Sequence, residues 1–136
     1  MSVKLFLRMT TIATALIGGA LLFLPLTVAN IFLTNSMQEG AIFVRFLGSS
    51  LVGYSYLNWY TARYDQFIVM RATIIGNFST LCIALLVSIL GVVGGVLNVR
   101  GLLIVALHLV FASGFGYYLL SLKKQKSSSV KVTSTL

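Results

Sequence analysis

FIVMRATIIGNFSTLCIALLVSILGVVGGV, residues 67–96, is the stretch that decides the fold class. Arg71 is its one charged residue, and the others are apolar or neutral. A membrane hydrocarbon core of about 30 Å needs roughly 20 apolar residues in helical form, and this stretch is long enough. Residues 9–33, 41–60 and 101–122 have the same character. The sequence therefore predicts an all-α membrane protein with four transmembrane helices.

The composition argues against a soluble globular protein. Of the 136 residues, 58% are hydrophobic and 9% are charged, which leaves too little polar surface to cover a soluble domain. The expected spans occupy most of residues 1–122, so we expect one membrane domain and no separate enzymatic domain. Residues 123–136 are basic and then rich in Ser and Thr, and we expect them to form a disordered cytoplasmic tail.

The distribution of Lys and Arg predicts the orientation, because basic residues near span ends are retained on the cytoplasmic side. One side of the expected membrane carries Arg45 and Arg100. The other side carries Lys4, Arg8, Arg63, Arg71, Lys123, Lys124, Lys126 and Lys131. Both termini should therefore be cytoplasmic. The net charge of +8 then indicates contact with the lipid bilayer and its anionic headgroups at that face, and no nucleic-acid partner.

The connections between the expected spans are short, at residues 34–40, 61–66 and 97–100. Short connections place consecutive helices side by side and antiparallel, which predicts an up-and-down bundle. Pro25 lies late in the first span and should kink it or end its straight part, because proline removes a helical hydrogen bond. Aromatic residues near the expected cytoplasmic interface are Trp59, Tyr60, Tyr64, Tyr117 and Tyr118, as in an interfacial belt.

Small and polar residues recur at steps of three and four along the third span. This stripe comprises Thr73, Asn77, Thr80, Ala84, Ser88, Gly91 and Gly95. Helices in membranes associate through close backbone approach and interhelical hydrogen bonds, so the stripe predicts a tightly packed helix interface. A polar path or a ligand groove is the alternative interpretation.

A second set of residues is a candidate polar cavity or ligand contact: Arg45, Ser49, Tyr56, Asn77 and His108. Arg45 lies about 6 Å inside the expected outer end of its span, where it could snorkel to water, pair with Glu39, or bind an anion or a headgroup. His108 is the one histidine, and its expected depth is close to that of Ser49. A Ser/His nucleophile pair is conceivable, but it lacks an orienting acid, so a hydrogen-bonded structural histidine is favoured.

No catalytic, metal or cofactor signature is present in the sequence. Both acidic residues, Glu39 and Asp65, fall in expected loops, which argues against a proton-driven carrier or a small multidrug transporter with a glutamate in its first span. A single histidine argues against haem. The single cysteine, Cys82, excludes an intramolecular disulfide and a quinone-linked thiol oxidoreductase.

The sequence therefore favours a non-enzymatic accessory or self-assembling subunit that acts through helix contacts with a protein partner or with further copies of itself. A carrier or channel for a small neutral or anionic solute is the alternative, and a membrane enzyme acting on lipid is the third hypothesis. In topology alone the chain resembles the small four-span proteins encoded in many bacterial genomes. We accordingly expect it in the cell membrane, as a multi-pass protein of a bacterial inner membrane.

Overall fold

The computed structural model describes residues 2–35, 40–64 and 66–133, with side chains described as far as residue 122. Within these residues the chain is all-helical and contains no strand, which confirms the predicted class. The helices are α1 (Val3–Phe23), α2 (Pro25–Phe32), α3 (Ala41–Arg63), α4 (Phe67–Val93) and α5 (Gly101–Thr133). Three segments are long and apolar enough to cross a membrane: α1, α4 and the part of α5 that ends at Leu122.

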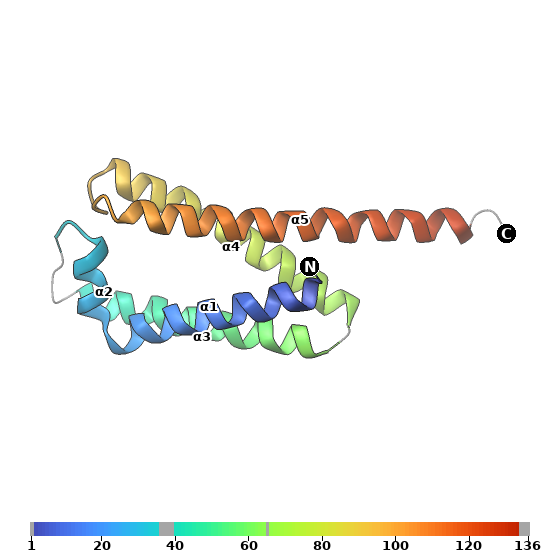
Figure 1. Cartoon of the computed structure of the whole chain (residues 1–136), viewed down its shortest axis with the longest axis horizontal. Helices are drawn as coiled ribbons and strands as arrows, with labels where there is room; N and C mark the ends of the chain where they lie inside the picture. The colour runs from blue at the N-terminus through green and yellow to red at the C-terminus, as the bar shows by residue number, and fades with distance from the viewer. Residues whose placement is uncertain (1, 36–39, 65, 134–136) are drawn as a thin grey trace.

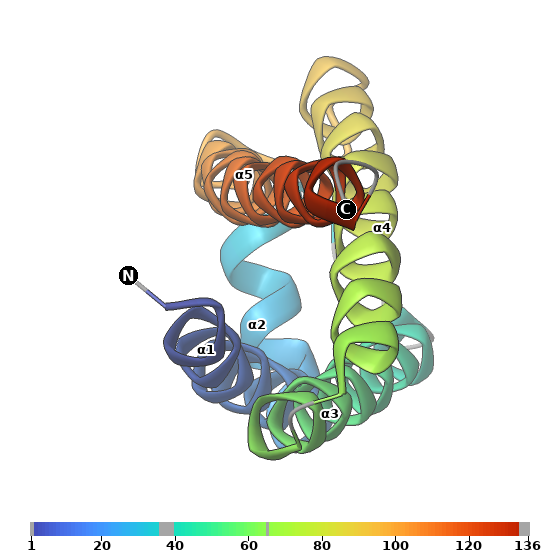
Figure 2. The same cartoon turned by 90° about the vertical axis from the view of Figure 1, so that its right-hand side faces the viewer.

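The helices are arranged as two hairpins (Figure 1). Helix α1 lies antiparallel beside α3, and α4 lies antiparallel beside α5. In the perpendicular view α4 runs from a position beside the end of α3 to a position beside α5, so it links the two hairpins (Figure 2). Both ends of the chain lie at the same end of the molecule (Figure 1).

The first predicted span differs from the observed helices at both its start and its middle. Helix α1 begins at Val3, because the Ser2 hydroxyl accepts a hydrogen bond from the Leu5 amide and caps the helix. Leu24 then breaks the helix with φ −125° and ψ 49°. Pro25 starts α2 at its first position, where its missing N–H removes no helical bond. The prediction that Pro25 would interrupt the first span is confirmed.

Helix α3 contains the second predicted span, but its apolar character is weaker than that of the other long helices. It is not among the segments whose length and hydropathy suit a membrane crossing. The reason lies in its composition, since Arg45 and several Ser, Asn and Tyr side chains dilute the apolar residues. Three apolar candidate spans are therefore shown instead of the four that were predicted.

The end of the chain also differs from the prediction. Helix α5 continues past the expected span end at Leu122 as far as Thr133, where the sequence predicted disorder. No glycine or proline follows Gly116, so the sequence offers no strong helix stop in this segment. A polar and basic composition without apolar periodicity, on which the disorder prediction relied, does not prevent the backbone hydrogen bonds of a helix.

The hairpins are joined first at the end of the molecule that carries the termini. A buried apolar cluster there draws on all four long helices and consists of Leu7, Ala62, Met70, Ile74, Phe115, Tyr118 and Leu122. Phe6 packs against it, with its ring centroid 4.8 Å from that of Phe115 in an edge-to-face arrangement. We call this set the terminal core.

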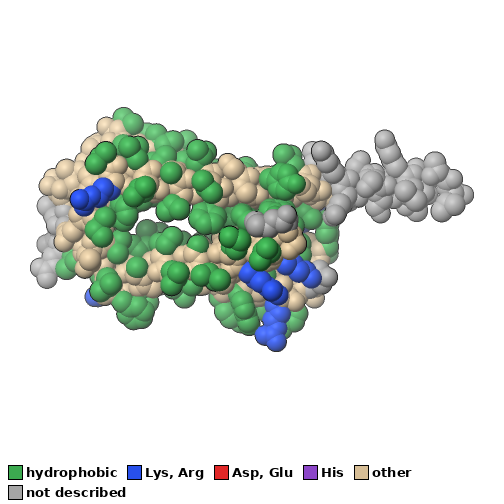
Figure 3. All heavy atoms as spheres, in the orientation of Figure 1, with side chains coloured by type: hydrophobic (Ala, Val, Ile, Leu, Met, Phe, Trp, Pro, Cys, Tyr) green, Lys and Arg blue, Asp and Glu red, His purple; other side chains and the backbone are tan. Residues whose placement is uncertain are grey.

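The second join lies at the opposite end, between the end of α2 and the turn that connects α4 to α5. Asn98 donates from its amide to the Phe32 carbonyl (2.9 Å) and from its side chain to the Ile31 carbonyl (2.9 Å). Thr34 donates from its amide to the Val96 carbonyl (3.0 Å). We call these contacts the α2 clasp. Between it and the terminal core the space-filling view is hollowed (Figure 3).

Asn98→Asp should weaken the α2 clasp. The variant keeps the side-chain oxygen that accepts from the Arg100 amide (2.9 Å) but loses the donations to Ile31 and Leu33. We expect the free energy of unfolding to fall by about 1–2 kcal/mol, measured by denaturation of the purified protein in detergent. Asn35→Asp makes the same chemical change at an exposed position and should have little effect; equal losses in both variants would contradict the assignment.

Candidate functional site

Polar side chains meet in pairs where α3 packs against α4. The Thr61 and Thr73 hydroxyls are 2.9 Å apart. Asn77 donates from Nδ2 to Asn58 Oδ1 at 2.9 Å, and a third pair joins the Tyr54 and Thr80 hydroxyls at 3.1 Å. We call these three pairs the polar ladder. It places the first half of the predicted stripe, from Thr73 to Thr80, against α3.

The central rung of the polar ladder is incompletely satisfied. Asn77 Nδ2 also donates to the Thr73 carbonyl at 2.8 Å. Asn58 is fully buried, and its Nδ2 has no hydrogen-bond partner among the described atoms. A buried amide donor without an acceptor is destabilising, so the Asn58 amide opposes part of the stability that the ladder provides.

The second half of the stripe faces α5 instead. Ser88 is buried and donates from its hydroxyl to the Ala84 carbonyl at 2.8 Å. Its oxygen also lies 3.1 Å from His108 Nδ1. The tautomer of His108 decides which of the two groups donates in this contact. Ala84 itself is half-buried on the same face.

The structure does not bring together the serine and histidine that could have formed a nucleophile pair. His108 is hydrogen-bonded to Ser88. Ser49 is exposed and donates within its own helix to the Phe46 carbonyl at 2.8 Å. The favoured interpretation of His108, a hydrogen bond across the helices, matches this geometry.

The two glycines at the end of the stripe serve the turn between α4 and α5. Gly95 has φ +71°, a backbone conformation that favours glycine, and it ends α4. A Cβ at Gly91 would lie 3.0 Å from Leu97 Cδ1, at the far end of a flexible side chain. Both positions therefore shape the chain reversal, which the prediction of one continuous packing stripe did not anticipate.

The candidate cavity residues are distributed over separate places. Arg45, Ser49 and Tyr56 lie on the exposed side of α3. Asn77 is buried in the polar ladder, and His108 of α5 contacts Ser88 of α4. They do not line one common cavity. Arg45 lines a hollow at one end of the α1–α3 hairpin, and a separate hollow lies at the opposite end of this hairpin.

The first hollow has a volume of about 430 Å³ and lies beside the break between α1 and α2. Its lining comprises Phe23, Leu24, Pro25, Leu26, Thr27, Ala41 and Arg45. The second hollow has a volume of about 310 Å³ and is lined by Arg8, Trp59 and Arg63. Each hollow contains at least one guanidinium group, so either could hold an anion.

Two glycines outside the predicted stripe and the candidate cavity bring α1 and α3 close together. A Cβ at Gly18 would lie 2.9 Å from the Gly48 carbonyl oxygen, and one at Gly48 would lie 2.8 Å from the Gly18 oxygen. The backbones of α1 and α3 are therefore in direct contact. Glycines within two apolar spans were the available signal, but nothing in the sequence showed that they face each other.

Among the described residues, no group of three or more His, Cys, Asp and Glu side chains could hold a metal ion. No protein-family model, no curated protein sequence and no solved structure matches the chain.

Proposed function

We propose that this protein is a non-enzymatic, four-span membrane subunit that acts through helix contacts, either with a different membrane protein or with further copies of itself. The observation that carries the proposal is the set of hydrogen-bond partners of the buried polar side chains. Among the buried polar side chains, Asn58, Thr61, Thr73, Asn77 and Ser88 take part in hydrogen bonds between helices, whereas Thr10 and Ser55 donate within their own helices. Bonds between helices hold spans together in a membrane and leave few groups for chemistry.

The proposal includes α3 as the fourth membrane crossing. Its 23 residues give a length of about 34 Å, which spans a hydrocarbon core. Its polar residues Ser55, Asn58 and Thr61 are buried against neighbouring helices and so would not face lipid. Arg45 and Arg63 lie near its two ends, where long side chains can reach the interfaces.

The proposed orientation places both termini in the cytoplasm of a bacterium, with the protein in the inner membrane. Lys4 and Arg8 belong to the first half of α1 and Arg63 to the last turn of α3; the start of α1 and the end of α3 lie toward the end of the molecule that carries the termini (Figure 1). Arg45 and Arg100 lie toward the other end. The positive-inside rule then assigns the end with the termini to the cytoplasm.

A site for a partner helix is supported by the way the hairpins are joined. They meet at the terminal core and at the α2 clasp, and the surface is hollowed between these joins (Figure 3). Apolar exposure alone does not indicate a partner within a membrane, because lipid is an equally apolar neighbour. Helix faces that remain apart within one chain, however, leave room for a further helix.

The test is the native mass of the complex extracted gently from its own membrane, with co-purifying proteins identified. We expect a mass well above the 14.8 kDa of one chain, either as an integral multiple or with a stoichiometric foreign subunit. A monomer at all protein concentrations, without a partner, would contradict the proposal.

A carrier for a small anionic solute is the second candidate, and the hollow beside Arg45 is the observation that favours it. Transporters often bind anions where a membrane helix is interrupted, as α1 and α2 are interrupted at Leu24. The same extraction separates the candidates, because a monomer that retains a small anion would support the carrier and contradict the assembly subunit.

A further inference from the structure

The second hollow, lined by Arg8, Trp59 and Arg63, has the dimensions of a small binding site. Its volume of about 310 Å³ lies at the lower end of the roughly 300–1,000 Å³ found for small-molecule sites. All three lining side chains are exposed, so the hollow is open to its surroundings. It could admit a compact charged group from the side without any opening movement.

The lining supplies the chemistry that recognises phosphate. Arg8 comes from α1 and Arg63 from the last turn of α3, so two helices each contribute a guanidinium. Arg63 Cζ lies 5.4 Å from the centroid of the Trp59 ring, a cation–π contact that positions the group. The Trp59 ring has no oxygen that could accept hydrogen bonds from the Arg63 guanidinium, so the N–H groups of Arg63 stay available to a ligand. The planar arrangement of these N–H groups matches the oxygens of a phosphate.

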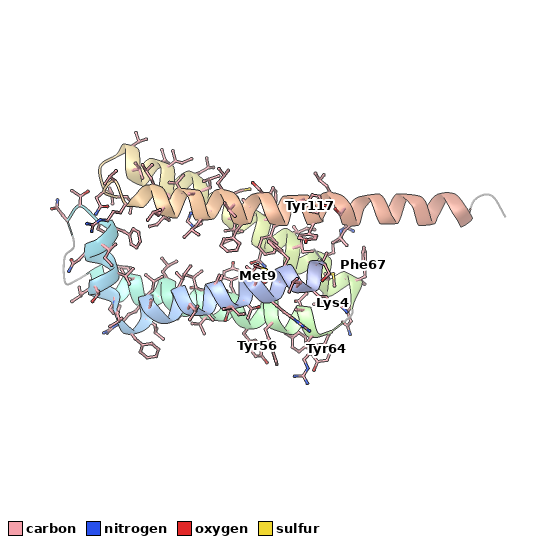
Figure 4. All side chains as sticks on the ribbon, viewed as in Figure 1. Lys4, Met9, Tyr56, Tyr64, Phe67 and Tyr117 are labelled. Atoms are coloured by element: carbon pink, nitrogen blue, oxygen red, sulfur yellow. The ribbon has the colours of Figure 1, made fainter. Side chains whose placement is uncertain are left out.

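The depth of the hollow agrees with the level of lipid phosphates. Helices α1 and α3 are antiparallel and touch at Gly18 and Gly48. Arg8 lies about three turns before Gly18, and Trp59 lies about three turns after Gly48, so the two residues are at the same depth. Trp59 belongs to an aromatic group in which its ring lies 6.1 Å from that of Tyr56. Tyr56 and Tyr64 lie on the outer side of α3 toward the end where Lys4 is found (Figure 4). Tyr and Trp side chains in such belts sit among lipid headgroups.

We propose that this hollow binds the phosphate of an anionic phospholipid headgroup in the leaflet that faces the termini. A lipid is favoured over a free phosphate ester because the hollow is lined by exposed side chains of a hairpin that is proposed to cross the membrane, and because it lies at headgroup depth. The proposal rests on the placement of α1 and α3 across the membrane, but it does not depend on whether the protein assembles with a partner.

Trp59 gives a direct measurement, because it is the only tryptophan in the chain. The full-length protein would be reconstituted in vesicles of phosphatidylcholine that contain increasing fractions of brominated phosphatidylglycerol. Bromine quenches tryptophan fluorescence at short range, so quenching reports the lipid beside Trp59. Brominated phosphatidylcholine at the same fractions gives the reference. We expect phosphatidylglycerol to be preferred by about fivefold for each arginine that binds it.

Arg8→Gln should reduce this preference by about fivefold and leave the Arg63–Trp59 contact in place. The double variant Arg8→Gln, Arg63→Gln should show no preference between the two lipids. Arg100→Gln removes an exposed arginine from the turn at the opposite end of the molecule and is the matched control. Circular dichroism and Trp59 emission in pure phosphatidylcholine would establish that each variant is folded.

An absence of preference in the unaltered protein would overturn the proposal. Retention of the preference in the double variant, or an equal loss in Arg100→Gln, would also overturn it, since general surface charge would then explain binding. Inorganic phosphate and glycerol phosphate added to the vesicles identify the source. No displacement of the brominated lipid at millimolar concentration supports the lipid headgroup, whereas full displacement would overturn the lipid in favour of a free phosphate ester.

Discussion

Gly48→Ala is expected to destabilise the protein, whereas Gly53→Ala on the same helix is expected to stabilise it. A Cβ at Gly48 would lie 2.8 Å from both the Gly18 carbonyl oxygen and the Leu22 amide nitrogen. Both contacts involve backbone of α1, so relief requires a shift of the whole helix. Gly53 has nothing within 4 Å of an added Cβ.

The magnitudes follow from two opposing contributions. Replacement of glycine by alanine within a helix stabilises it by up to about 1 kcal/mol. Overpacking at a tight contact costs about 1–3 kcal/mol, and at Gly48 this cost should exceed the gain. Gly48→Leu should therefore abolish the α1–α3 contact entirely, while Gly19→Leu, next to the contact but with open space around it, should fold.

Thermal unfolding of the purified variants in one detergent, followed by circular dichroism, provides the comparison. The informative result is the sign of the difference between Gly48→Ala and Gly53→Ala, because detergent and helix propensity affect both variants alike. If Gly48→Ala proves as stable as Gly53→Ala, α1 and α3 do not approach each other at Gly18 and Gly48.

Asn77→Leu is expected to destabilise the protein more than Asn58→Leu, although the two side chains are bonded to each other. Loss of Asn77 removes the donor to Asn58 Oδ1 and leaves the fully buried Asn58 amide without any partner among the described atoms. Loss of Asn58 removes a donor that is already unsatisfied, and Asn77 still donates to the Thr73 carbonyl.

We expect Asn77→Leu to lower the free energy of unfolding by about 1–3 kcal/mol, which is the cost of an unsatisfied buried polar group. Asn58→Leu should cost less than about 1 kcal/mol, and the double variant should be close to Asn58→Leu. A double-mutant cycle on the free energies of unfolding measures the coupling. Equal losses in the two single variants, with no coupling, would contradict the bonding pattern of the polar ladder.

The sequence was sufficient to predict the helical class and the segments that form the long helices. Length and hydropathy are local properties, so residues 67–96 and 101–122 indicated α4 and the apolar part of α5 directly. Pro25 likewise acted locally, through its missing amide hydrogen. The segments of lower apolarity were predicted less well, as α3 and the end of α5 show.

The arrangement of the polar sites could not be predicted in the same way, because it depends on which faces of two neighbouring helices are turned toward each other. The stripe on the third span was visible at Thr73, Asn77 and Thr80. Its partners Asn58 and Thr61 follow Ser55 at steps of three on the buried face of α3, but Arg45, Ser49 and Tyr56 make another face of the same helix polar as well. A single sequence contains the spacing along each helix and not the rotation of one helix against another.

The unknown rotation of the helices also explains why the candidate cavity residues do not meet in the structure. It explains too why the hollow lined by Arg8, Trp59 and Arg63 was not predicted. His108 and Ser49 were matched by their expected depth, yet helices can direct side chains at equal depth away from each other. Arg8, Trp59 and Arg63 were each assigned to the interface by their place in the sequence. Their convergence on one hollow required the register of α1 against α3, which the Gly18–Gly48 contact determines.

The terminal core also has a consequence for the biosynthesis of the chain. Leu7 near the start of α1 is packed in the same cluster as Phe115 and Leu122 of α5. Contacts within each hairpin are local and can form as soon as its second helix is inserted, whereas this contact must await the last helix. In the proposed four-span topology, the α1–α3 hairpin therefore spends time in the membrane with Leu7 and Ala62 uncovered. Insertion factors or quality-control proteases would have access to it during that interval.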